Sequence, residues 1–104
     1  MADPVTLINV FEVPADEVDA FVEDWKRRAD IMAAAPGFGG FRLYRALSKD
    51  SRFQLVNVAQ WESAEHLAAA RSDPAFQEQI SELAQREQAG YANPAIYQIA
   101  VERD

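Results

Sequence analysis

Residues 52–67 read RFQLVNVAQWESAEHL, and this stretch contains a strand followed by a helix. From Arg52 to Trp61 the residues are mostly apolar, with valines that favour extended backbone, which predicts a strand. Ser63 is a residue type that caps helices, so we expect a helix from there through Ala70. Because side chains alternate along a strand, one face holds Phe53, Leu55, Asn57, Ala59 and Trp61. An amide therefore lies in the middle of an otherwise apolar strand face.

Upstream of this strand, FGGFRLYRAL at residues 38–47 predicts another strand, joined to the first by the polar segment SKDS. Two strands with a short polar connection favour an antiparallel pair. Before them, Pro36 and Gly37 end a helix that Asp16 begins as N-cap, because proline disfavours helical geometry in the preceding residue. The apolar positions of that helix recur three and four residues apart: Val18, Phe21, Val22, Trp25, Ala29 and Met32.

The two ends of the chain add the remaining elements. VTLINVFEV at residues 5–13 predicts a first strand, whose faces are both largely apolar, as in a strand that is covered on both sides. Asp73 and Pro74 form an N-cap followed by proline at the first helical position, so we expect a helix over residues 73–88. PAIYQIAVE at residues 94–102 predicts a closing strand.

These elements follow the order strand, helix, strand, strand, helix, strand over a single domain of residues 1–104. This is the ferredoxin-like split pattern, an α+β fold in which the helices cover one face of an antiparallel sheet. The opposite face would expose apolar side chains, which marks an interaction surface. Its members are Ile8, Val10, Tyr44, Val56, Val58, Ile99 and Val101. We therefore expect a homodimer in which two sheets pack face to face.

The composition narrows the classes of function. The 104 residues include 17 acidic and 10 basic side chains, for a formal net charge of -7. This sign disfavours nucleic acid and anionic membranes as partners. The chain has no cysteine and one histidine, which excludes thiol chemistry and leaves no clustered metal ligands. We therefore expect no bound metal. Since no segment has the roughly 18 apolar residues that a membrane span needs, we also expect a cytoplasmic protein.

Polar residues on apolar faces are the candidates for function. An unpaired buried amide costs about 1 to 3 kcal/mol, so Asn57 must either bond to the backbone or a buried water, or face a ligand. Asn9 raises the same alternatives on the first strand. Trp61 can offer a ring and an N–H donor to a cleft or can pack in the core, and Trp25 has the spacing of a core residue. His66 is either a solvated side chain or a proton carrier.

Three segments together resemble the antibiotic biosynthesis monooxygenase family. They are PGFGGFRLYR (residues 36–45), QWESAEHL (60–67) and SDPAF (72–76), in that order and spacing. The resemblance extends from Val5 to Val101, and it implies the dimeric α/β-barrel fold known for the family. It is more specific for the fold than for the reaction, because family members with this pattern act on different substrates.

One branch of that family oxidises anthrone-like aromatics to quinones without a cofactor. It has an asparagine four residues before a strand-end tryptophan, which Asn57 and Trp61 match. It also uses a tyrosine shortly after the tryptophan, where this chain has Glu65, His66 and Leu67. The resemblance implies Asn57 as a hydrogen-bond donor to an oxyanion, with His66 as the nearest substitute for the tyrosine.

The haem-degrading branch has an asparagine on the first strand and the same tryptophan, which Asn9 and Trp61 match. Its iron ligand is a histidine on the last helix, where our alignment places Gln79. Residues 73–88 contain no histidine, and an amide is a poor replacement for an imidazole ligand. The resemblance thus favours the cofactor-independent reaction, with haem degradation as the alternative.

These observations predict a small monooxygenase that oxidises an electron-rich aromatic or polyketide-type substrate, such as an anthrone or a quinol, with O2. The catalytic residues would be Asn57, Trp61 and Asn9. The substrate-binding residues would be Phe21, Trp25, Phe76, Ile80 and His66. The further alternative is a domain without catalysis that binds a small aromatic molecule or serves assembly. An open pocket beside the catalytic residues would favour catalysis, and a filled one would favour assembly.

Overall fold

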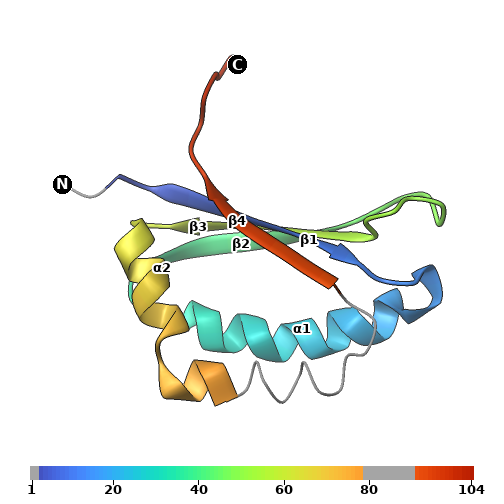
Figure 1. Cartoon of the computed structure of the whole chain (residues 1–104), viewed down its shortest axis with the longest axis horizontal. Helices are drawn as coiled ribbons and strands as arrows, with labels where there is room; N and C mark the ends of the chain where they lie inside the picture. Colours follow the sequence, from blue (N-terminus) through green and yellow to red (C-terminus); the bar gives the residue numbers. More distant parts are fainter. Residues whose placement is uncertain (1–2, 79–90) are drawn as a thin grey trace.

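The computed structural model describes residues 3–78 and 91–104. Figure 1 shows a single sheet with the helices packed beneath it. In chain order the elements are β1 (Val5–Glu12), the 3-10 turn η1 (Ala15–Glu17), α1 (Val18–Ala33), β2 (Phe38–Arg45), β3 (Leu55–Trp61), α2 (Ala64–Arg71) and β4 (Tyr91–Tyr97). Residues 74–78 are also helical.

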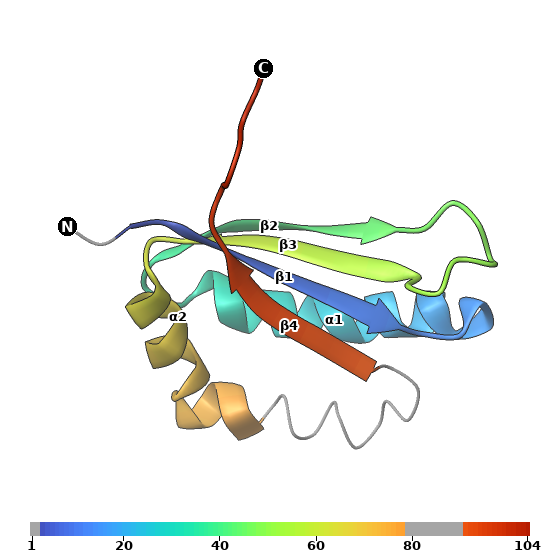
Figure 2. The ribbon, with the colours of Figure 1, turned by 45° about the horizontal axis from the view of Figure 1, so that its top comes forward.

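The four strands form one antiparallel sheet in the order β2-β3-β1-β4. Figures 1 and 2 show α1 and α2 on the same side of this sheet, with the other side uncovered by any described helix. We call these the covered face and the open face. The predicted α+β fold, with an antiparallel sheet and helices on one face, is confirmed.

The covered face carries two apolar clusters because α1 and α2 each bury one stripe of side chains against it. The α1 cluster consists of Phe11, Val13, Val18, Phe21, Trp25, Ala29 and Leu55. The α2 cluster consists of Leu7, Met32, Ala59, Trp61, Leu67 and Ala70. The predicted helical stripe and strand face are thus the ones that become buried.

A polar row separates the two clusters. On β3, Asn57 lies between Leu55 of the α1 cluster and Ala59 of the α2 cluster. On β1, Asn9 lies between residues of the same two clusters, and its Cα is paired with that of Asn57. Leu43 of β2 is paired with Asn57 from the other side. The side chains of Asn9 and Asn57 therefore form a polar row across the middle of the covered face.

The start of α1 differs from the prediction that Asp16 caps it. Residues 15–17 form a 3-10 turn, in which the Glu17 N–H donates to the Pro14 carbonyl at 2.9 Å, and α1 begins at Val18. No side chain caps either element. The chain thus enters α1 through a tight turn closed by the Pro14 carbonyl and not through a cap by the Asp16 side chain.

The hairpin between β2 and β3 is longer than predicted, since the strands end at Arg45 and begin again at Leu55. The cause is Gln54, whose buried side-chain amide donates to the Ser48 carbonyl at 3.0 Å and to the Ser51 carbonyl at 2.7 Å. These bonds hold the loop in a bend that strand pairing would not allow.

The last strand, β4, begins at Tyr91 and ends at Tyr97. These bounds are three and five residues earlier than the predicted ones, 94 and 102. Tyr97 pairs with Thr6, near the beginning of β1, so beyond Tyr97 the neighbouring strand has almost run out. Ile99 and Val101, which we expected on the open face of the sheet, instead belong to an exposed segment that projects away from the body (Figures 1 and 2). A strand needs a neighbour, and this segment has none within the described chain.

Candidate functional site

Asn57 is the most deeply buried polar side chain of the described sheet. It is 1 % exposed, and its Oδ1 has no hydrogen-bond partner among the described residues. Because β3 alternates strictly, its position between Leu55 and Ala59 places the amide beneath the helices. An amide in this state costs about 1 to 3 kcal/mol. Within residues 3–78 and 91–104, the amide oxygen of Asn57 thus has no protein partner.

Asn9 lies opposite Asn57 and is in a different state. Its Oδ1 accepts a hydrogen bond from the Asn93 backbone N–H at 2.9 Å, and Asn93 Nδ2 donates to the Val10 carbonyl at 3.1 Å. These bonds join β1 to β4 next to Pro94, which is paired with Asn9 and has no N–H to donate. Asn9 therefore has a structural role that Asn57 lacks.

Trp61 ends β3 within the α2 cluster. It is 2 % exposed, its ring packs edge-on against Phe38 with centroids 5.3 Å apart, and its Nε1 has no partner among the described residues. Four residues of strand separate it from Asn57, about 13 Å at 3.3 Å per residue. The two side chains share a face, but one small molecule can contact both only if it is extended along the strand.

The predicted apolar wall is divided between the two clusters. Phe21 and Trp25 belong to the α1 cluster, where their rings stack with centroids 6.4 Å apart. Trp25 Nε1 is also buried without a described partner. Phe76 is half-buried against the α2 cluster. Ile80 lies outside the described residues, as does Gln79.

His66 is held at the start of α2. Its Nδ1 lies 2.7 Å from Ser63 Oγ, which also accepts the His66 backbone N–H at 3.1 Å and so caps the helix as predicted. Its Nε2 is 3.9 Å from Glu62 Oε2. The ring lies against Gly37, where a Cβ would come within 2.4 Å of His66 Cγ. His66 thus joins α2 to the turn before β2.

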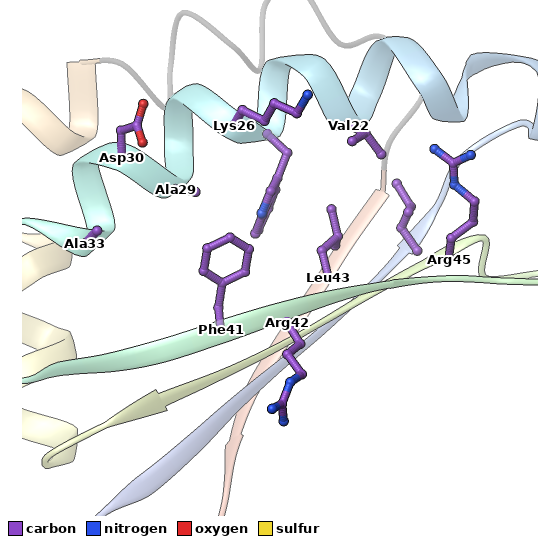
Figure 3. Close-up of a pocket in the computed structure, with 11 residues that line it drawn as sticks. Val22, Lys26, Ala29, Asp30, Ala33, Phe41, Arg42, Leu43 and Arg45 are labelled. Carbon is purple, nitrogen blue, oxygen red and sulfur yellow. The ribbon is translucent and has the colours of Figure 1, made fainter.

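A cleft of about 530 Å³ opens between α1 and the edge strand β2, on the covered side of the sheet. Figure 3 shows Phe41 and Leu43 rising into it from β2, while Arg42 points toward the other face. Its apolar wall consists of Val22, Trp25, Ala29, Ala33, Phe41, Leu43 and Leu55. Asn57 does not line it, although two of its neighbours do. The sequence analysis missed this cleft, and the small residues Ala29 and Ala33 were the available signal.

Metal ligands are not gathered anywhere in the described part of the chain. No group of three or more His, Asp or Glu side chains there could hold a metal ion. In the same residues, no helix is long and apolar enough to cross a membrane. The candidate site is therefore a buried amide beneath the helices, flanked by two tryptophans whose N–H groups lack described partners.

Comparison with known proteins identifies the family of the chain. The model of the family described as antibiotic biosynthesis monooxygenase matches residues 4–81. The chain belongs to this family. A haem oxygenase (mycobilin-producing) of Mycobacterium tuberculosis is 36 % identical over 73 residues, which cover 70 % of this chain and 68 % of that protein.

Two solved structures of similar proteins cover almost the whole chain. A candidate monooxygenase from Shewanella loihica PV-4 has a TM-score of 0.82 and 34 % identity, covering 98 % of this chain and 99 % of its own. SnoaB, a cofactor-independent oxygenase from Streptomyces nogalater, has a TM-score of 0.77 and 24 % identity, covering 97 % of both chains. The fold of this family member is thus shared across proteins with different names.

Proposed function

We propose that this family member is a cofactor-independent monooxygenase that oxidises an electron-rich aromatic substrate, of the anthrone or quinol type, with O2. The observation that carries the proposal is the Asn57 amide, which is buried beneath the helices and whose oxygen has no partner in the part of the chain that the structure describes. Buried polar groups are nearly always satisfied, and a role in binding or catalysis is one reason for an exception. The name of the similar protein SnoaB supports the absence of a cofactor.

The reaction requires no electrons from the protein. When an anthrone becomes a quinone, one CH2 group becomes a carbonyl, and the substrate supplies all the electrons. One atom of O2 becomes the carbonyl oxygen, and the other leaves as water with the two hydrogens. The protein must favour loss of the first proton, because the resulting enolate reacts with O2 far faster than the neutral molecule.

Asn57 is suited to hold the substrate oxygen through this step. An amide carries both an acceptor and a donor, and rotation about its last bond exchanges them. Asn57 can accept from a phenolic hydroxyl and donate to the anion that forms after the proton leaves. In a water-free site, one such donor contributes about 100-fold or more to the rate.

The neighbouring aromatic residues would hold the substrate ring. Trp25 and Phe21 on one side, and Trp61 on the other, lie on the same face of the sheet as Asn57. Because Trp61 is about 13 Å along the strand, it would contact the far end of a polycyclic substrate. Phe76, Ile80 and Asn9 remain predicted contacts, and His66 remains the predicted proton carrier.

The test is oxygen uptake by purified, metal-free protein with an anthrone as substrate. We expect uptake with stoichiometric quinone formation, measured with an oxygen electrode and by absorbance. Boiled protein is the control for spontaneous oxidation. Uptake equal to the boiled control would contradict the proposal for this substrate class and favour a domain that binds or assembles without catalysis.

Haem degradation is the second candidate, because the relative from M. tuberculosis is named as a haem oxygenase. The described residues do not fit haem well. The one histidine of the chain, His66, has Nδ1 engaged by Ser63 and Nε2 turned toward Glu62, and Gln79 offers only an amide, a poor iron ligand. A titration with haem should give no Soret shift typical of axial imidazole, and such a shift would make this candidate the first.

We also propose that the protein acts as a homodimer. The open face holds half-buried valines and Tyr44, which is 52 % exposed, and Val101 in the projecting segment is 90 % exposed. A second copy packed on this face would cover an apolar surface that the described chain leaves bare. Light scattering should give twice the mass of 11.6 kDa at micromolar concentration, and a monomer mass would contradict the dimer. Cytoplasmic location remains a prediction.

A further inference from the structure

The cleft between α1 and β2 is separate from the Asn57 amide, and it has its own binding chemistry. We propose that this cleft binds a planar aromatic carboxylate, with the ring against Phe41 and the carboxylate on Arg45. This goes beyond the proposed oxidation, because Asn57, Trp61 and Asn9 do not line the cleft, and Trp25 is the one described residue of the proposed substrate site that does. Its volume of about 530 Å³ is within the range of small-molecule pockets, roughly 300 to 1,000 Å³.

The hollow exists because α1 presents small side chains to the edge strand. Ala29 and Ala33 lie one helical turn apart and face β2, where larger residues would fill the space. The floor is Leu43 and Leu55, which belong to the sheet. The apolar cleft is thus bounded by α1 on one side and by β2 on the other.

Aromatic rings give the cleft a preference for flat molecules. The Phe41 ring is 38 % exposed, although it lies on the covered side of the sheet. Its centroid is 6.3 Å from that of Trp25, at an interplanar angle of 63°. A flat ligand can therefore stack on the open side of Phe41 while its edge contacts the tryptophan, and both arrangements are favourable for aromatic pairs.

Arg45 provides the charge at one end of the cleft. Its Nη2 lies 2.9 Å from Asp19 Oδ1, so the guanidinium already holds one carboxylate across the mouth of the cleft. Both side chains are more than half exposed, and such pairs contribute about 0 to 1 kcal/mol. A ligand carboxylate, which can bond to arginine through both oxygens, would replace Asp19 at little cost.

The other charged groups around the cleft fix the orientation of the ligand. Lys26 Nζ is already paired with Glu23 Oε1 at 2.9 Å. Asp30 lies at the opposite end from Arg45 (Figure 3), eleven residues after Asp19 on α1, or about 16 Å at 1.5 Å per residue. An acid would be repelled by Asp30 and attracted to Arg45, so its carboxylate faces the beginning of α1.

The test compares anthracene-9-carboxylate with its neutral counterpart, 9-anthracenemethanol, by isothermal titration calorimetry. We expect Arg45→Gln to weaken binding of the acid about five-fold, as loss of an exposed charge-assisted contact should, without changing binding of the alcohol. Asp19→Asn should strengthen binding of the acid about two-fold, because it removes the internal competitor. Arg52→Gln is the matched control, since Arg52 forms an exposed pair with Glu12 outside the cleft.

A second pair of variants tests the location. Ala33→Phe should fill the cleft and abolish binding of both compounds, whereas Ala20→Phe, on an exposed position of α1 outside the cleft, should leave binding intact. Asn57→Ala should also leave it intact, which separates this proposal from the proposed reaction. The proposal is overturned if neither compound binds, if Ala33→Phe binds as well as the parent chain, or if Arg45→Gln and Asp19→Asn do not shift the acid in opposite directions.

Discussion

The two faces of the sheet are incomplete in different ways. On the covered face the helices bury most side chains, and among the described residues the Asn57 amide oxygen and the N–H groups of two tryptophans are buried without a partner. On the open face, large side chains such as Tyr44 stay in contact with water. The covered face thus has a few buried polar atoms without described partners, whereas the open face has a broad apolar surface without a cover. A small ligand can satisfy the polar atoms, whereas only a protein can cover the apolar surface.

The largest expected effect is on the open face. Val56→Asp places a charge among the apolar side chains of that face, where an unpaired charge would cost about 3 kcal/mol or more on association. This is more than roughly 100-fold in the dissociation constant. Analytical ultracentrifugation should show monomer where the parent chain is a dimer. Ala68→Asp, on an exposed position of α2, should stay dimeric, and a dimeric Val56→Asp would contradict the face-to-face arrangement.

On the covered face, Asn57→Ala should lower turnover of an anthrone about 100-fold or more, because the developing oxyanion loses its donor. Oxygen uptake at saturating substrate measures this, and circular dichroism checks that the variant is folded. Asn9→Ala should lower turnover much less, since the Asn9 oxygen is engaged by Asn93. Equal losses in the two variants would mean that Asn57 has no special role.

Two glycines near the start of β2 should differ in how they tolerate an added methyl group. Gly37 and Gly40 both have positive φ, 83° and 107°. At Gly37 a Cβ would collide with His66, while at Gly40 it would meet nothing within 4 Å. Gly40→Ala should lower the free energy of unfolding by about 1 kcal/mol from backbone strain alone. Gly37→Ala should lower the free energy of unfolding by about 1 to 3 kcal/mol more than this strain does, because its methyl group also overpacks against His66.

Thermal unfolding of both glycine variants, at one protein concentration, measures the difference. Gly37→Ala combined with His66→Ala should recover most of the overpacking cost, because the ring that collides has been removed. If Gly37→Ala and Gly40→Ala were equally stable, the contact between His66 and the turn would be absent in solution.

The smallest expected effect distinguishes the two asparagines by stability. Asn57→Leu replaces an unsatisfied amide by an apolar group of similar size and should raise the free energy of unfolding by about 1 kcal/mol. Asn9→Leu leaves the Asn93 backbone N–H without its acceptor and should lower it by about 1 kcal/mol. Denaturant unfolding at one protein concentration measures both. A destabilised Asn57→Leu would indicate that the amide has an internal partner after all.

Much of the fold could be predicted because it depends on periodicity. The stripe containing Phe21 and Trp25 and the alternation around Asn57 each specify a buried face from local spacing alone. The misplaced boundaries depend on particular contacts and not on periodicity. Gln54 bonds to carbonyls six and three residues before it in the same loop, and β4 ends where its neighbour β1 begins. The spacing of apolar residues specifies neither contact.

The candidate site was predictable only in part, for the same reason. The sequence identified Asn9 and Asn57 as amides on apolar faces but could not tell which of them is bonded, because the partner of Asn9 lies 84 residues away along the chain. It contained the small residues Ala29 and Ala33 but could not show that they face the edge strand, and the exposure of Phe41 beside Trp25 depends on that arrangement.

By itself, the sequence determined the order of the elements, which faces are apolar and the family to which the chain belongs, because these follow from spacing and residue type within short segments. Only the tertiary structure decided that the Asn9 oxygen is bonded while the Asn57 oxygen has no partner in the described ranges, that His66 packs against Gly37, and that a cleft opens between α1 and β2. Hydrogen bonds and packing between distant segments depend on which segments the sheet places side by side, and no local sequence pattern specifies these neighbours.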